Sequence, residues 1–153
     1  MGVPGEKSWE NLRREAFVAA VRTRGCPDVA VGPVRAGNNT TWEEQEEEIA
    51  DWLRLLPKPV GIMVNHDVQG IQMLDACRRA KLRVPDEVAV VSVDNDTVLC
   101  NIADPPLSSL DQNVQRLGFE AAEMLDAMMR GKRRTRATTS SSLCTSSPGN
   151  PPT

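Results

Sequence analysis

An apolar run, Val88–Val93, constrains the fold of this chain more than any other stretch. A near-continuous run of this length is typical of a strand that is buried on both faces of a parallel sheet. Asp94, Asn95 and Asp96 follow it directly. Because ligands of open α/β sheets bind beyond the carboxyl ends of the strands, these side chains predict a site for a small polar molecule.

A second apolar run, Val60–Val64, ends in a similar polar cluster, Asn65, His66 and Asp67. If the two strands are neighbours, both clusters face one crevice, where carboxylates and amides suit a hydroxyl-rich ligand. Asn and Asp after a strand also commonly cap the next helix. The spacing alone leaves ligand binding and helix capping as equal alternatives.

Helical periodicity alternates with these strands along the chain. Gly25 ends a first helical segment, Thr41 and Glu44 form a capping box that opens a second, and Gly131 ends the last. Val29–Val31 is a further short strand candidate. The alternation predicts an α/β fold with a parallel sheet flanked by helices.

The helix that opens at Thr41 begins with a run of glutamates, which complement the positive end of the helix dipole. We expect a solvated helix face here, in preference to a metal or partner site. The glutamates are Glu43, Glu44, Glu46, Glu47 and Glu48.

Charge and cysteine spacing limit the classes of function. The 153-residue chain has a net charge of −3, which argues against direct binding of nucleic acid. No apolar run approaches the roughly 20 residues that span a bilayer, and the N-terminus lacks the apolar core of a signal peptide. The four cysteines include no Cys-x-x-Cys pair, which predicts unpaired thiols in a reducing cytosol. We therefore expect a cytoplasmic protein.

Residues 132–153 differ from the rest of the chain. They contain four basic residues, no acidic ones, and mostly Ser, Thr and Pro. Such a segment buries too little apolar surface to offset the entropy of ordering, so we expect a disordered tail.

Two catalytic interpretations use the polar clusters. His66 is the single histidine, and no Gly-x-Ser-x-Gly motif accompanies it, so a Ser-His-Asp triad is not indicated. An apolar strand followed by Asp94-x-Asp96 is similar to the nucleophile motif of haloacid-dehalogenase-type phosphatases, whose aspartates work beside a magnesium ion. In that family the motif opens the domain, whereas here it lies late in the chain. A magnesium-dependent phosphatase using Asp94 and Asp96 is therefore the least favoured of the three interpretations, and the other two follow from a family resemblance.

Three stretches together resemble the sugar-sensing domain of the lac/gal repressor family, whose fold is shared with periplasmic sugar-binding proteins. The resemblance extends over residues 7–131. Trp9 and the stretches 41–63 and 99–110 look closest to one branch, the xylose-operon activators, which join this sensor to a C-terminal AraC-type DNA-binding domain. The three stretches are Arg13–Phe17, Val88–Asp96 and Pro105–Gln112.

The resemblance implies a partial periplasmic-binding-protein-like (type I) fold, mainly the C-terminal lobe, in which residues 112–130 form a crossing helix. It implies that the chain binds the effector of a transcription regulator, a sugar and specifically a pentose such as xylose, without catalysis, cofactor or metal. The parent is expected to be a homodimer that contacts DNA only through a domain absent from this chain. Since roughly one lobe is missing, we expect a fragment. A transport-type sugar-binding protein is the second interpretation, disfavoured by the missing signal sequence and the unpaired cysteines.

The resemblance also assigns ligand-binding residues by position. It implies a ligand-contacting arginine, a stacking aromatic residue, an aspartate that bonds sugar hydroxyls and a glutamine at the crossing. An asparagine-aspartate pair after the earlier strand has a histidine here in place of the asparagine. In this order the residues are Arg13, Phe17, Asp94, Gln112 and the pair His66 and Asp67.

Overall fold

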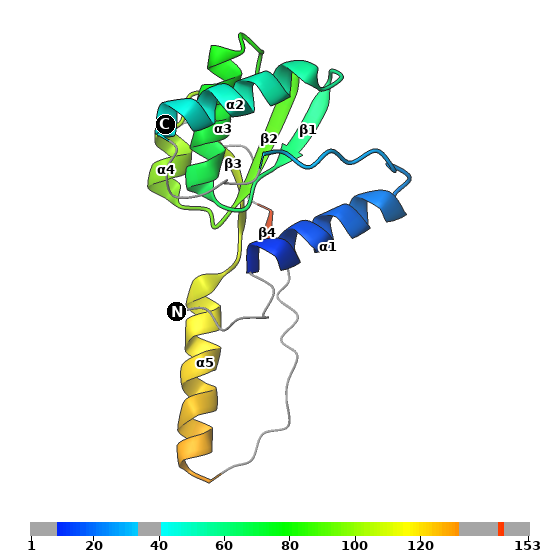
Figure 1. Ribbon diagram of the computed structural model, residues 1–153. Coiled ribbons are helices and arrows are strands. Elements are labelled where there is room, and N and C mark those ends of the chain that lie inside the picture. Colours follow the sequence, from blue (N-terminus) through cyan, green and yellow to red (C-terminus); the bar gives the residue numbers. More distant parts are fainter. Residues whose placement is uncertain (1–8, 34–40, 132–143, 146–153) are drawn as a thin grey trace.

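The computed structural model describes residues 9–33 and 41–131 with their side chains, and residues 144–145 by their backbone. Helices and strands alternate along most of this part of the chain (Figure 1). In chain order the elements are α1 (Trp9–Thr23), α2 (Trp42–Leu55), β1 (Val60–Met63), α3 (Asp67–Arg79), β2 (Val88–Val93), α4 (Thr97–Ile102), β3 (Ser108–Asp111), α5 (Val114–Met129) and β4 (Cys144–Thr145).

The strands form one sheet in the order β1-β2-β3-β4. β1 pairs with β2 and β2 pairs with β3 in parallel, whereas β4 is antiparallel to β3. The predicted parallel sheet is therefore present. Val29–Val31, expected as a strand, has no regular secondary structure. It lies between Pro27 and Pro33, which lack the backbone N–H that a strand ladder requires.

The main core lies where α2 and α3 pack against each other and against β1 and β2 (Figure 1). Leu53 of α2, Cys77 of α3 and Val88 of β2 are among its most completely buried side chains. The apolar faces of these helices and strands therefore meet in one cluster. The cluster is aliphatic because the chain has few aromatic residues. Its buried members are Ala50, Leu53, Ile62, Val64, Met73, Ala76, Cys77 and Val88.

The burial of β2 differs from the expectation of a strand covered on both faces. Ala89 is exposed and Val91 is half-buried, so one face is open near the start of the strand. Ser92 and Val93 are the only two consecutive residues of β2 that are both buried, and their side chains point to opposite faces of the sheet. The strand is thus enclosed at its carboxyl end, next to the polar cluster.

A smaller cluster joins α3 to α4 and to the segment before β3. It consists of Leu74, Cys100 and Leu107. Gly70 allows this approach, because a Cβ atom there would overlap the Leu107 side chain. α3 therefore lies close to the chain that leads into β3.

The start of α2 confirms the capping box but corrects the expected solvated glutamate face. Thr41 Oγ1 accepts a hydrogen bond from the Glu44 backbone N–H, and Glu44 bonds back to the Thr41 N–H at 2.8 Å. Glu46, however, is buried and accepts a hydrogen bond from Arg79 Nε of α3 at 2.6 Å. It also accepts one from Trp42 Nε1. This glutamate joins α2 to α3 because a complementary charge from another helix lies beside it.

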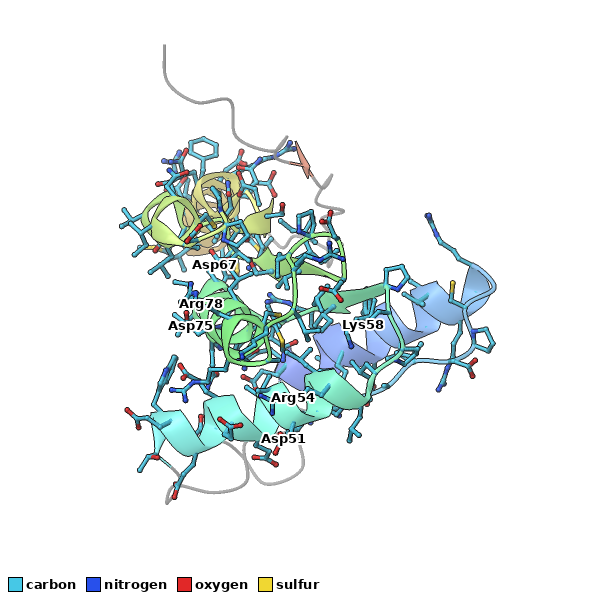
Figure 2. All side chains as sticks on the ribbon, turned by 90° about the horizontal axis from the view of Figure 1, so that it is seen from above. Asp51, Arg54, Lys58, Asp67, Asp75 and Arg78 are labelled. Atoms are coloured by element: carbon cyan, nitrogen blue, oxygen red, sulfur yellow. The ribbon has the colours of Figure 1, made fainter. Side chains whose placement is uncertain are left out.

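Other charged pairs lie within single helices on exposed surfaces. Asp51 and Arg54 of α2 are 2.5 Å apart, and Asp75 and Arg78 of α3 are 2.6 Å apart (Figure 2). Exposed pairs of this spacing contribute at most a few tenths of a kcal/mol each. They therefore have little influence on the fold.

Helices α1 and α5 lie at the periphery, and neither contains a buried residue. α5 extends away from the sheet and its helices (Figure 1). The helix expected over residues 112–130 is thus present, and its role as a crossing between lobes stays a prediction. Apart from β4, the tail expected over residues 132–153 lies outside the described residues.

Candidate ligand-binding site

The carboxyl ends of β1 and β2 lie side by side. Met63 is in register with Val91, and the Val64 N–H donates to the Val91 carbonyl at 3.0 Å. The loop after β1 and the loop after β2 therefore start at the same edge of the sheet. The sequence pattern left open whether the two strands are neighbours, and the structure shows that they are.

Asp94 is the centre of the polar groups at this edge. It follows β2 directly, has a backbone φ of +115°, and leaves 44% of its side chain exposed. Arg13 Nη1 of α1 lies 3.9 Å from Asp94 Oδ1, and Gln112 Nε2, just after β3, donates a hydrogen bond to the same oxygen. Three segments far apart in the sequence thus bring a cation, an anion and an amide together.

Arg13 has further partners that hold its guanidinium in place. Nη1 also donates to the Asn65 carbonyl oxygen after β1. The guanidinium carbon lies 5.1 Å from the centre of the Trp9 ring, within range of a cation–π interaction. A side chain fixed on both sides in this way is already oriented toward Asp94.

Trp9 adds an aromatic surface to this edge. Its ring is 6.3 Å from the His66 ring, with the planes tilted by 50°, and 55% of the residue is exposed. The sequence resemblance included Trp9 but did not assign it to the ligand-binding residues. The signal was available, because Trp9 and Arg13 are four residues apart on a helix and therefore share a face.

His66 caps a helix, which is one of the two alternatives that the spacing left open. Its Nδ1 accepts a hydrogen bond from the Gln69 N–H at 3.3 Å and so caps α3. The residue is only half-buried, and its ring faces Trp9. His66 therefore caps the helix while its ring remains at the edge of the site.

Phe17 lies two turns beyond Trp9 and one turn beyond Arg13 on α1, and it is half-buried. Residues spaced by four share a helix face, so Trp9, Arg13 and Phe17 form one stripe. The structure places Phe17 on the same helix, one turn after Arg13. Its predicted stacking role stays a prediction.

Asp67 is the predicted site residue whose position differs most from the expectation. It is 1% exposed, and its carboxylate faces the interior. Oδ1 accepts hydrogen bonds from Ser92 Oγ at 2.5 Å and Ser109 Oγ at 2.6 Å, and Oδ2 accepts one from the Asp96 N–H at 2.7 Å. With its oxygens occupied by these donors, Asp67 is not placed to contact a ligand in the crevice.

Asp96 has a capping role. Its Oδ1 accepts hydrogen bonds from the N–H groups of Val98 and Leu99, at 2.9 and 3.2 Å, at the start of α4. In the phosphatase interpretation this carboxylate would handle a proton beside a metal ion. Among the described residues no group of three or more His, Cys, Asp or Glu side chains is arranged to hold a metal.

The described thiols are unpaired, as the cysteine spacing predicts. Burial raises the pKa of the Cys77 thiol to about 11. Burial and then the negative charge of Asp67 raise the pKa of Cys100 to about 11 as well. Both groups are therefore protonated near neutral pH, whereas Cys26 is exposed.

The described helices include none that is long and apolar enough to span a bilayer.

Comparison with known proteins identifies the family. Residues 1–146 match the periplasmic binding protein-like domain. The chain belongs to this family. The type I fold expected from the sequence is thereby confirmed.

The similar curated proteins include transcription regulators. The xylose operon regulatory proteins of Haemophilus influenzae and Escherichia coli are both 30% identical to the chain, over 83% and 80% of its residues. The chain spans about a third of the length of these relatives, 33% and 31% respectively.

The similar solved structures also include transcription regulators. The xylose-binding transcription activator XylR matches 84% of the chain and 34% of its own, with a TM-score of 0.69 and 26% identity. A LacI-family regulatory protein from Chloroflexus aggregans matches 86% of the chain and 46% of its own, with a TM-score of 0.68 and 26% identity. These relatives support the LacI-like part of the predicted resemblance. They give no support to its AraC-type part.

Proposed function

We propose that the chain forms a sugar-binding lobe of a LacI-like transcription regulator. The observation that carries the proposal is the convergence of Arg13, Asp94 and Gln112 at the carboxyl ends of parallel strands. A carboxylate can accept hydrogen bonds from two adjacent hydroxyls, while a guanidinium and an amide donate to hydroxyl or ring oxygens. The edge therefore offers both kinds of partner that a sugar requires.

Aromatic side chains beside these polar groups favour a sugar over a simple anion or cation. Trp9 is exposed next to Arg13, and Phe17 follows on the same helix face. The apolar C–H face of a sugar ring packs on such rings while its hydroxyls bond to the polar groups. His66, at the position where the family resemblance implies asparagine, can bond one further hydroxyl through the ring nitrogen that does not cap α3.

The finer parts of the proposal rest on the named relatives. We propose a pentose such as xylose as the effector, because the xylose operon regulators and the xylose-binding activator are among the relatives found. We further propose that the parent protein is a cytoplasmic homodimer that reaches DNA through another domain. Sugar binding would shift the population of its DNA-binding states only through a difference in affinity between those states.

Nuclear magnetic resonance titration tests the proposed site directly, because it detects even weak binding. We expect D-xylose to shift the backbone amide signals of Asn65, Asp94 and Gln112 in the ¹⁵N-labelled chain. L-arabinose, D-ribose, D-glucose and cellobiose serve as competing candidates for the effector. In Asp94→Ala the affinity should fall about tenfold or more, since hydrogen bonds to charged groups contribute roughly 1.5–3 kcal/mol.

Asp86→Ala is the matched control, because Asp86 is an exposed aspartate at the opposite end of β2. It should bind sugar as the unmodified chain does. Equal affinities of Asp94→Ala and the unmodified chain would remove Asp94 from the site. The absence of signal shifts at this edge with every sugar would refute the proposed function.

A further inference from the structure

We propose that Asp67 is a positioning residue of the sugar site, which holds the loop after β2 in the conformation that presents Asp94. The inference rests on the proposed function, because it concerns how that site is built. It assigns to Asp67 a different role from direct ligand contact.

The loop after β2 has an unusual backbone. Asp94 and Asn95 have φ angles of +115° and +57°, in a region that residues with a side chain rarely adopt. Consecutive residues in such conformations persist only where surrounding contacts hold them. The question is which groups hold this loop.

Each backbone N–H of the loop has an identified acceptor. The Asp94 N–H donates to the Leu110 carbonyl at 3.0 Å, within the sheet edge. The Asn95 N–H donates to Ser109 Oγ at 2.9 Å, and the Asp96 N–H donates to Asp67 Oδ2 at 2.7 Å. Two of these acceptors are side-chain oxygens that belong to one network.

Asp67 organises that network. Ser109 Oγ gives its hydrogen to Asp67 Oδ1 at 2.6 Å and accepts the Asn95 N–H through a lone pair. Asp67 therefore holds Asn95 through Ser109 and holds Asp96 directly. One carboxylate thus fixes the two residues that follow Asp94.

The location of Asp67 suits a charged group that is kept inside the protein. It is the first residue of α3, where the helix dipole favours a negative charge, and it is labelled in Figure 2. A buried carboxylate is tolerated when hydrogen bonds replace its hydration, and here three donors do so. The donors come from β2, from β3 and from the loop after β2, so Asp67 links α3 to these three segments.

Three variants separate positioning from simple stability. Asp67→Ala removes both anchors of the loop. Asp67→Asn is the conservative variant, because its carbonyl oxygen can still accept from Asp96 while its NH₂ group faces the serine hydroxyls. Ser92→Ala is the matched control: it removes a hydrogen bond to the same carboxylate oxygen but no contact with the loop.

Amide hydrogen exchange and xylose titration are the two measurements. In Asp67→Ala we expect the Asn95 and Asp96 amides to exchange at least about tenfold faster, and xylose affinity to fall about tenfold or more. The Val64 amide, which bonds across β1 and β2, should keep its protection. Asp67→Asn should restore both quantities to within about threefold, and Ser92→Ala should change both less than Asp67→Ala does.

Two results would overturn the inference. One is unchanged loop exchange together with unchanged xylose affinity in Asp67→Ala. The other is a loss of affinity in Asp67→Asn with the loop amides still protected, which would make Asp67 a direct sugar contact. If Asp67→Ala does not fold, Ser109→Ala replaces it: unchanged Asn95 exchange and affinity in that variant would equally refute positioning.

The exchange measurement also separates this inference from the proposed function. If the unmodified chain binds no sugar, the proposed function fails. The protection of the Asn95 and Asp96 amides in the variants still decides whether Asp67 holds the loop.

Discussion

His66 and Asp67 are adjacent in the sequence but have different surroundings. His66 is half-buried with its ring facing Trp9, whereas Asp67 is buried among hydrogen-bond donors. His66 is the N-cap of α3 and has an extended backbone, whereas Asp67 is the first helical residue, so the two side chains lie in different surroundings. The family resemblance assigned both to the ligand, whereas the sequence pattern alone left ligand binding and helix capping as equal alternatives. The donors Ser92 and Ser109, distant in the chain, decide their separate roles.

The cysteines give a prediction at the residue scale. Iodoacetamide at about pH 8 should label Cys26 in the folded protein at least about a hundredfold faster than Cys77 or Cys100. The thiolate is the reactive form, and a pKa of about 11 leaves little thiolate on the two buried residues. Mass spectrometry of peptides from native and urea-unfolded samples measures the three rates. Rapid labelling of Cys77 in the native state would contradict the buried position described here.

At the scale of the elements, the pairing of α2 with α3 depends on a contact that periodicity does not reveal. The run of glutamates in α2 is uniformly charged, and nothing in the run distinguishes Glu46 from its neighbours. Arg79, 33 residues away in the sequence, supplies the partner that allows Glu46 to be buried. Sequence patterns predicted the helix and its capping box correctly because both are local.

Substitution of Glu46 tests this contact. Glu46→Ala should lower the free energy of unfolding by about 1–2 kcal/mol. This is at or below the roughly 1.5–3 kcal/mol of a hydrogen bond to a charged group, since Arg79 is 43% exposed and partly solvated. Glu48→Ala, an exposed glutamate of the same helix, should change it by less than about 0.5 kcal/mol. Urea denaturation followed by circular dichroism measures both. Equal effects of the two substitutions would show that the Glu46–Arg79 pair contributes nothing specific.

At the scale of the whole molecule, the sequence predicted the sheet better than the surroundings of its helices. Apolar runs that end in polar clusters identify parallel strands and place a site at their carboxyl ends, and the register of β1 with β2 agrees. Periodicity also predicted the helical segment that forms α1. It could not show that α1 has no buried residue, or that it meets the strand ends through Arg13. Those facts depend on which surfaces meet in three dimensions.

The buried thiols link the stability of the whole molecule to pH. Cys77 and Cys100 have pKa values raised from 9.0 to about 11, so the folded state binds their protons more tightly than the unfolded state does. Their contribution is complete below about pH 9 and is lost as pH rises toward 11, by on the order of 2 kcal/mol per thiol. Urea unfolding at several pH values should show this decline. A variant with Cys77→Ala and Cys100→Ala should lose less stability over the same interval, because other groups that titrate there remain in both proteins. Parallel pH profiles of the two proteins would contradict the assignment.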